Sequence, residues 1–289
     1  MVTSNLRKVN ISYYTLNNLK NRFYKGNSIA ALMFGMAVVL IKSILYLNYS
    51  NNHTVNIFEG FMFNFLSAPD TMFMMVPALL LFIDAPFIDD YSFMAVYRMK
   101  RKNWFYSNYI YIIIKTFLYN FILLVTSFIP LLFKGYSENQ WSQTFLKMMN
   151  GYSAKMDKYH LASPIKELKM FTPLKAILIT IILFSLYIIF LSEILFAINM
   201  VCKRKYLGTF VVGGMYIILS IIDGQAFMLP DSIRKVLINR NVFFAMYYNP
   251  KISNYFFSIL YLLLLNYIVY IFASTLFPFA DFEESNNEN

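Results

Sequence analysis

The chain has very few of the residues that catalysis and covalent cross-linking use. It contains one cysteine, Cys202, and two histidines, His53 and His160, in 289 residues. A single cysteine excludes an internal disulfide, and neither histidine has a cysteine or paired acids beside it, as a metal site would need. The signatures H-E-x-x-H and G-x-S-x-G are also absent. We therefore expect no catalytic residue, no bound cofactor and no metal ion in this chain.

Charged residues are scarce as well. They make up 14% of the chain, while apolar residues make up 58%. Ordinary globular domains have about 25% charged and roughly 45–50% apolar residues. This composition excludes an ordinary soluble domain and predicts a chain that lies largely in a membrane.

Six apolar segments are long enough to cross a bilayer, which takes about 20 helical residues. They predict an all-α fold, because the strands of a membrane barrel need only about 10 residues and alternate in polarity. The second segment is the shortest and contains Pro77 and Asp84. The predicted spans are 28–49, 71–88, 107–133, 173–200, 207–229 and 255–277.

The segments outside these spans have their own patterns. Residues 1–27 carry apolar side chains at helical spacing, which favours an amphipathic helix lying on the membrane surface; a flexible basic tail is the alternative. Residues 134–172 form the largest polar segment, and we expect short helices there on the outer side. Residues 278–289 are acidic and polar, which predicts disorder. The apolar positions of the first segment are Tyr13, Leu16, Leu19 and Phe23.

Lysine and arginine gather in three short segments, before the first span and after the second and fourth. Together these hold twelve bases. Cytoplasmic loops carry such an excess, so the pattern predicts a multi-pass protein of the plasma membrane with both termini in the cytoplasm. The basic loop between the last two spans is an exception to this pattern. The net charge of +10 thus favours contact with anionic lipid over nucleic acid.

The most charged and aromatic stretch follows the second span. Two acids open it, an aromatic and apolar stretch follows, and bases close it, which complements the dipole of a short helix over 89–102. Trp104 and Tyr106 then mark the aqueous boundary of the third span. We interpret 89–102 as a cytoplasmic helix parallel to the membrane. Its candidate contact residues are Asp89, Asp90, Tyr91, Phe93, Met94, Val96, Tyr97, Arg98, Lys100 and Arg101.

The order of these residues resembles the permease subunits of type-two ATP-binding-cassette (ABC) exporters. The similarity lies in "DDYSFMAVYRMKRKNWF", in the preceding "MMVPALLLFIDAPF" and in "YYNP" before the last span. The glycine usual after the acidic pair is replaced by Ser92 and Phe93. The resemblance implies that 89–102 is the coupling helix, which docks on an ABC ATPase subunit. A basic anchor that has no protein partner is the alternative.

The chain has no G-x-x-x-x-G-K-[ST] phosphate-binding loop. If ATP drives it, a partner subunit binds the ATP and magnesium. The resemblance also implies a second permease copy or a related permease. The many aromatic and methionine residues favour a hydrophobic or amphipathic substrate such as a peptide, an antibiotic or a lipid-like molecule. The alternative function is a stand-alone immunity, sensor or channel-like protein without an ATPase; a membrane enzyme is a third hypothesis.

Four ionisable residues lie inside the predicted spans: Lys42, Lys115, Glu193 and Asp223. Such residues are costly in lipid and often functional. Lys115 and Glu193 lie at similar depth from the inner face, and Lys42 and Asp223 at similar depth from the outer face, so each pair is a candidate ion pair or a lining for a substrate path. The alternative is that the lysines extend their ammonium groups to the membrane surface.

Overall fold

The structure is a computed structural model that describes residues 11–51, 53–66, 68–85, 101–151, 154–161, 166–202, 204, 206–224 and 252–276. Most of these residues are helical. Four helices are long and apolar enough to cross a membrane, and a bent helix pair makes five if it counts as one span. The long helices are α2 (Gly26–Ser50), α6 (Arg101–Phe128), α9 (Pro173–Cys202) and α13 (Ile252–Leu276). This supports the predicted all-α membrane architecture, whereas six spans stay a prediction.

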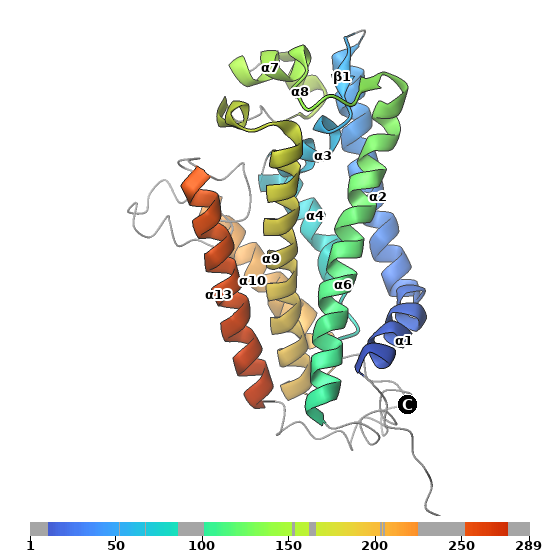
Figure 1. Cartoon of the computed structure of the whole chain (residues 1–289), viewed down its shortest axis with the longest axis vertical. Helices are drawn as coiled ribbons and strands as arrows, with labels where there is room; N and C mark the ends of the chain where they lie inside the picture. The colour runs from blue at the N-terminus through green and yellow to red at the C-terminus, as the bar shows by residue number, and fades with distance from the viewer. Residues whose placement is uncertain are drawn as a thin grey trace, which may run out of the picture.

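Helix α9 is the centre of the bundle. It packs against α6, α13, α4 (Ala68–Leu80) and α10 (Leu207–Gly224), and Figure 1 shows it between α6 and α13. In its most apolar stretch 61% of the residues are buried, against 22% in α13. A helix that is apolar all round is usually buried in protein or in lipid. We therefore assign α9 to the protein interior and most of the surface of α13 to lipid.

The second predicted span differs most from expectation. Helix α4 has 13 residues, about 20 Å of helix, which is too short to cross alone. It follows α3 (Glu59–Met62) and the 3-10 helix η1 (Phe63–Phe65), whose direction differs from that of α4 by 90°. All residues of α3 and η1 are buried. Irregular backbone at membrane depth is tolerated where protein covers it. In the described part of the predicted span 71–88 the helix ends at Leu80, and positions 86–88 lie outside the described residues.

The fifth predicted span is also shorter in the described residues. Helix α10 ends at Gly224, and positions 225–229 lie outside the described residues. The start of α10 is tight: a Cβ on Gly208 would lie 2.5 Å from the Leu195 carbonyl oxygen. A glycine is therefore needed where α10 turns back against α9.

The N-terminal helix, α1 (Ile11–Phe23), packs its more polar side against α6. The Trp104 indole N–H donates to the Tyr14 hydroxyl at 3.0 Å, and the Thr15 hydroxyl donates to the Ser107 carbonyl at 3.3 Å. Tyr13 and Leu16, two of the predicted membrane-facing residues, are each 64% exposed. An exposed apolar side is what a helix at the lipid surface needs; the surface location stays a prediction.

The end opposite α1 is folded as well. It contains the expected short helices, α7 (Gln143–Asn150), α8 (Ala154–Lys158) and the 3-10 helix η3 (Lys166–Met170), above the ends of the long helices (Figure 1). It also contains strands that the all-α prediction missed. β1 (Val55–Asn56) pairs in parallel with β2 (Gly135–Tyr136), which follows the 3-10 helix η2 (Ile129–Phe133).

A buried carboxylate fastens this end. Glu59 is fully buried, and its two oxygens accept four hydrogen bonds. The donors are the Tyr46 hydroxyl at 2.6 Å, the Asn56 N–H at 3.0 Å, and the N–H and hydroxyl of Ser142 at 2.6 and 3.0 Å. Ser142 also caps α7 by accepting the Phe145 N–H. One side chain thus ties α2, α3, β1 and α7 together.

Candidate functional site

The candidate site is the junction between α4 and the segment predicted to be the coupling helix. Positions 86–100, and with them all the predicted contact residues except Arg101, lie outside the described residues, as does the predicted tail. Arg101 is the exposed first residue of α6. Both ends of the segment are described, so the structure shows what holds them.

Lys115 holds the end of α4 from the side of α6. Its ammonium donates to the Leu81 carbonyl oxygen at 2.8 Å and to the Ser28 hydroxyl at 2.9 Å, and only 2% of the residue is exposed. The ring centroids of Tyr111 and Phe82 lie 5.3 and 5.5 Å from Nζ. A cation is favourable at the carbonyl end of a helix and against aromatic faces. Lys115 therefore links α2, α4 and α6 through one buried charge.

Two asparagines complete this junction. The Asn27 amide donates to the Asp84 carboxylate at 3.0 Å. The Asn199 amide of α9 donates to the Ala85 carbonyl oxygen at 2.6 Å, and its own oxygen accepts the Gly208 N–H at 2.6 Å. Asn199 is buried, and buried polar groups are held by such complementary partners, whereas the bond of Asn27 to Asp84 is exposed. We call this set the exit clamp; its side chains are Asn27, Lys115 and Asn199, and it holds Leu81, Asp84 and Ala85.

The far end of the segment is anchored too. Trp104 is fully buried, bonded to Tyr14 and with its ring centroid 6.2 Å from that of Phe196. The location of Trp104 at the aqueous boundary of a span stays a prediction, but its side chain is covered by protein. The reason is that α1 folds back over the start of α6 and covers it. Movement of the segment would thus act on α1 and α9 as well as on α4.

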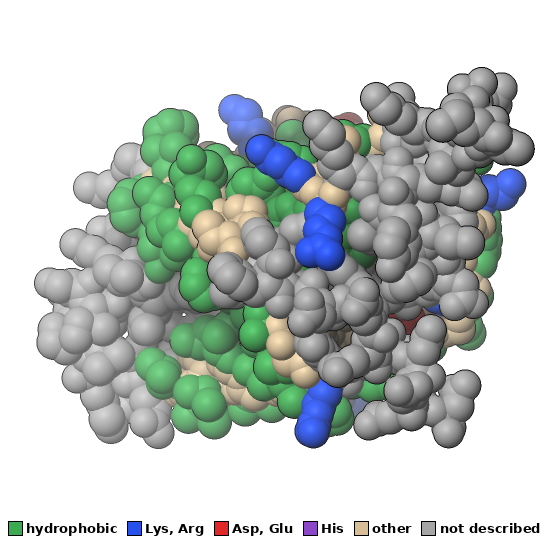
Figure 2. Space-filling view, turned by 90° about the horizontal axis from the view of Figure 1, so that it is seen from below, with side chains coloured by type: hydrophobic (Ala, Val, Ile, Leu, Met, Phe, Trp, Pro, Cys, Tyr) green, Lys and Arg blue, Asp and Glu red, His purple; other side chains and the backbone are tan. Residues whose placement is uncertain are grey.

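Basic side chains surround this end of the molecule. Figure 2 shows lysine and arginine side chains distributed over it. The opposite end also carries exposed lysines, including Lys147 and Lys158. Because long external segments translocate largely regardless of charge, the predicted orientation continues to rest on the short segments. The exposed bases around the clamp are Lys20, Lys25, Arg101, Lys102 and Arg204.

The ion pair proposed between Lys115 and Glu193 is not present among the described residues. Lys115 bonds to Ser28 and Leu81, and neither oxygen of Glu193 has a hydrogen-bond partner among the described residues. Lys42 pairs with Asp70 at 2.6 Å; the side chain of Asp223 lies outside the described set. Depth along a span does not determine which side of the helix a residue occupies, and that side decides the partner.

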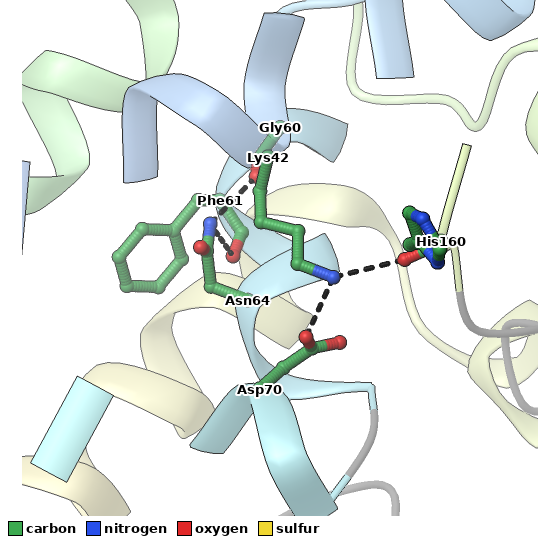
Figure 3. A network of polar contacts seen from close by, with 6 residues as sticks. All are labelled: Lys42, Gly60, Phe61, Asn64, Asp70 and His160. Atoms are coloured by element: carbon green, nitrogen blue, oxygen red, sulfur yellow. Dashed lines mark hydrogen bonds and ion pairs between the residues drawn. The ribbon is translucent and has the colours of Figure 1, made fainter. Parts of the chain in front are cut away.

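Lys42 forms a second polar network at the other end of α4 (Figure 3). Besides its ion pair with Asp70, its ammonium donates to the His160 carbonyl oxygen at 2.9 Å. The neighbouring Asn64 of η1 donates instead to the Gly60 carbonyl of α3, four residues earlier, at 3.1 Å. Asp70 lies in the first turn of α4, so lysines from α2 and α6 hold opposite ends of this short helix.

Comparison with models of protein families, with curated proteins and with solved structures finds no match for this chain. The contacts of the exit clamp are therefore the structural feature on which a function can be proposed. Sequence reasoning missed Asn199 as part of the exit clamp and Asp70 as the partner of Lys42. Each had a local signal: Asn199 is a polar residue in the last turns of an apolar helix, and Asp70 is an acid at the start of one.

Proposed function

We propose that this chain is the permease subunit of an ABC exporter, which moves a hydrophobic or amphipathic substrate with energy from ATP hydrolysed by a separate subunit. The observation that carries the proposal is the exit clamp. A coupling helix needs a rigid route into the membrane helices, and the clamp supplies one at the point where the predicted coupling segment leaves α4.

The mechanism follows from the contacts. A displacement of the coupling segment by the ATPase would move Ala85 and Leu81, whose carbonyl oxygens are bonded to Asn199 and Lys115. Asn199 transmits the movement to α9 and the start of α10, and Lys115 transmits it to α2 and α6. Packed interfaces of this kind shift as units between discrete arrangements. Six spans, a second permease copy and two ATPase subunits complete the proposed assembly, in the plasma membrane with the clamp on the cytoplasmic side.

Co-purification tests the partnership. A tagged chain is purified from membranes of its native host, and the attached proteins are assayed for ATP hydrolysis. We expect an ABC ATPase to accompany the native chain. Changing Phe93→Asp and Tyr97→Asp together should remove it, since acids on the apolar side of the coupling helix oppose docking. The matched control is Met170→Asp, an exposed apolar residue of η3, which should retain the ATPase.

Two outcomes contradict the proposal. In the first, the native chain carries no ATPase under conditions that keep membrane complexes intact. In the second, the Phe93→Asp/Tyr97→Asp chain retains as much ATPase as the control does. Either result favours a stand-alone sensor or immunity protein.

A further inference from the structure

A narrow pocket lies where α6, α9 and α13 meet, away from the exit clamp. Its free space is about the size of one water molecule. Glu193 is its acidic residue, and the rest of the lining is mostly aromatic and aliphatic. The lining residues used below are Phe105, Tyr109, Glu193, Phe196, Tyr270 and Ala273.

The Glu193 carboxyl is buried, and no described residue gives it a hydrogen bond of full geometry. Only 3% of the residue is exposed, and neither oxygen accepts a hydrogen bond from any described residue. The Tyr109 hydroxyl is the one neighbouring donor among the described residues that acts on the carboxyl, and it does not reach full hydrogen-bond geometry. Glu193 lies nine residues before the inner end of α9, about 13 Å into the membrane. A carboxyl at that depth that lacks a full set of hydrogen-bond donors is stabilised by a proton or by a cation.

The walls of the pocket suit a cation. The ring centroid of Tyr270 lies 4.9 Å from that of Tyr109 and 5.6 Å from that of Phe105. Phe105 also packs against Phe196, with centroids 5.8 Å apart. Aromatic faces attract ammonium groups electrostatically, and more strongly where water is excluded. A bare carboxylate among aromatic rings is the combination that recognises an amine.

We propose that this pocket binds the primary ammonium group of a cationic amphiphile, with Glu193 as its counter-ion. The space admits a group the size of a water molecule, so a primary ammonium fits and a trimethylammonium is too large. The apolar tail would lie along the exposed aliphatic side chains next to the pocket, such as Ile110 of α6 and Ile271 of α13. That the amphiphile is also the transported substrate rests on the proposed function; the binding itself does not.

The test uses the purified full-length chain in nanodiscs of uncharged lipid, with radiolabelled dodecylammonium as the probe and empty nanodiscs as background. We expect saturable binding. Glu193→Gln keeps the shape of the side chain but removes its charge, and should weaken binding at least tenfold. Glu138→Gln, a change at an exposed glutamate of the outer end, should leave binding unchanged. Neither dodecanol nor dodecyltrimethylammonium should compete with the probe.

A second variant separates loss of the site from loss of the fold. Ala273→Leu fills the pocket from α13 while Glu193 remains, and should abolish saturable binding. The proposal is overturned if no saturable binding occurs, if Glu193→Gln or Ala273→Leu binds like the native chain, or if dodecanol competes as well as the amine. Because the assay contains no ATPase, its result is independent of the co-purification test. Either proposal can therefore fail while the other stands.

Discussion

The chain buries two glutamates in opposite ways. Glu59, at the end of the molecule that carries α7, is fully buried and accepts four hydrogen bonds from three residues. Glu193, in the C-terminal half of α9, is 3% exposed and accepts none from the described residues that meets hydrogen-bond geometry. The donors around Glu59 come from backbone and side chains that converge on it. The groups around Glu193 are mainly aromatic rings.

This difference separates a structural acid from a functional one. A buried carboxylate that is fully hydrogen-bonded fixes the elements that supply its donors. A buried carboxylate without partners lowers stability, and proteins keep such a departure from the packing rules mainly at functional sites. The four predictions that follow test this contrast, beginning with the largest expected effect.

Replacing Glu59 should cost the most stability. Glu59→Leu leaves the Tyr46 hydroxyl and the N–H groups of Asn56 and Ser142 buried without an acceptor. Each such group costs about 1–3 kcal/mol, so we expect the free energy of unfolding to fall by about 3 kcal/mol or more. Denaturation of the purified chain by a graded series of SDS measures it. The control is Glu138→Leu at an exposed position; equal stability of the two variants would contradict a structural role for Glu59.

Asn199→Leu should have a smaller effect. It leaves the Ala85 carbonyl and the Gly208 N–H without their side-chain partner, and we expect a loss of about 2 kcal/mol by the same assay. Asn48→Leu, at an exposed position of α2, serves as the control. The functional consequence is distinct from the loss of stability: the complex should still hydrolyse ATP, with transport reduced. A variant with native stability and native transport would show that the exit clamp does not couple.

The Lys42–Asp70 pair should contribute less still. Its side chains are 15% and 9% exposed, and ion pairs that reach solvent contribute about 0.2–1 kcal/mol. A double-mutant cycle with Lys42→Met and Asp70→Asn measures the interaction between the two side chains. We expect a coupling energy of about 1 kcal/mol or less that declines in high salt. A coupling energy that is insensitive to salt would place this pair among the buried structural contacts, with Glu59.

Glu193→Gln should be the mildest change in stability. Removing a buried charge that has no partner relieves a desolvation cost, so the free energy of unfolding should stay the same or rise. The same SDS series measures the free energy of unfolding of this variant and of Glu59→Gln. The Glu59→Gln change keeps the size of the side chain but weakens its hydrogen bonds. If Glu193→Gln destabilises the chain as much as Glu59→Gln does, the contrast between the two acids is wrong.

The long helices were predictable because an uninterrupted apolar run determines the first and last residues of a membrane helix. The predicted span 28–49 became Gly26–Ser50, and 173–200 became Pro173–Cys202. The second span was not predictable in this way. An apolar segment surrounded by lipid must be a regular helix, whereas one covered by protein can bend. The sequence of α3 and η1 does not show whether protein or lipid surrounds these two helices.

The polar contacts were harder to predict than the helices. Lys115 shares its side of α6 with Tyr111, four residues earlier, whereas the aromatic residues of α6 in the Glu193 pocket are Phe105 and Tyr109. Depth placed Lys115 and Glu193 together, but helix rotation keeps them apart. The two-residue strands had no periodic signal of their own. Strand β2 begins at Gly135, where a Cβ would lie 2.5 Å from the Leu131 carbonyl oxygen. A glycine is needed there, but a glycine alone does not predict a strand.

The central claim is that the segment over 89–102 faces the cytoplasm, where an ATPase can reach it. Site-specific labelling with a membrane-impermeant maleimide tests this most directly, in a Cys202→Ser background because the native cysteine is exposed. A cysteine introduced by Arg98→Cys should react only after the cells are permeabilised, and one introduced by Lys147→Cys, in α7 at the opposite end, should react in intact cells. Labelling of the Arg98→Cys chain in intact cells would contradict the account.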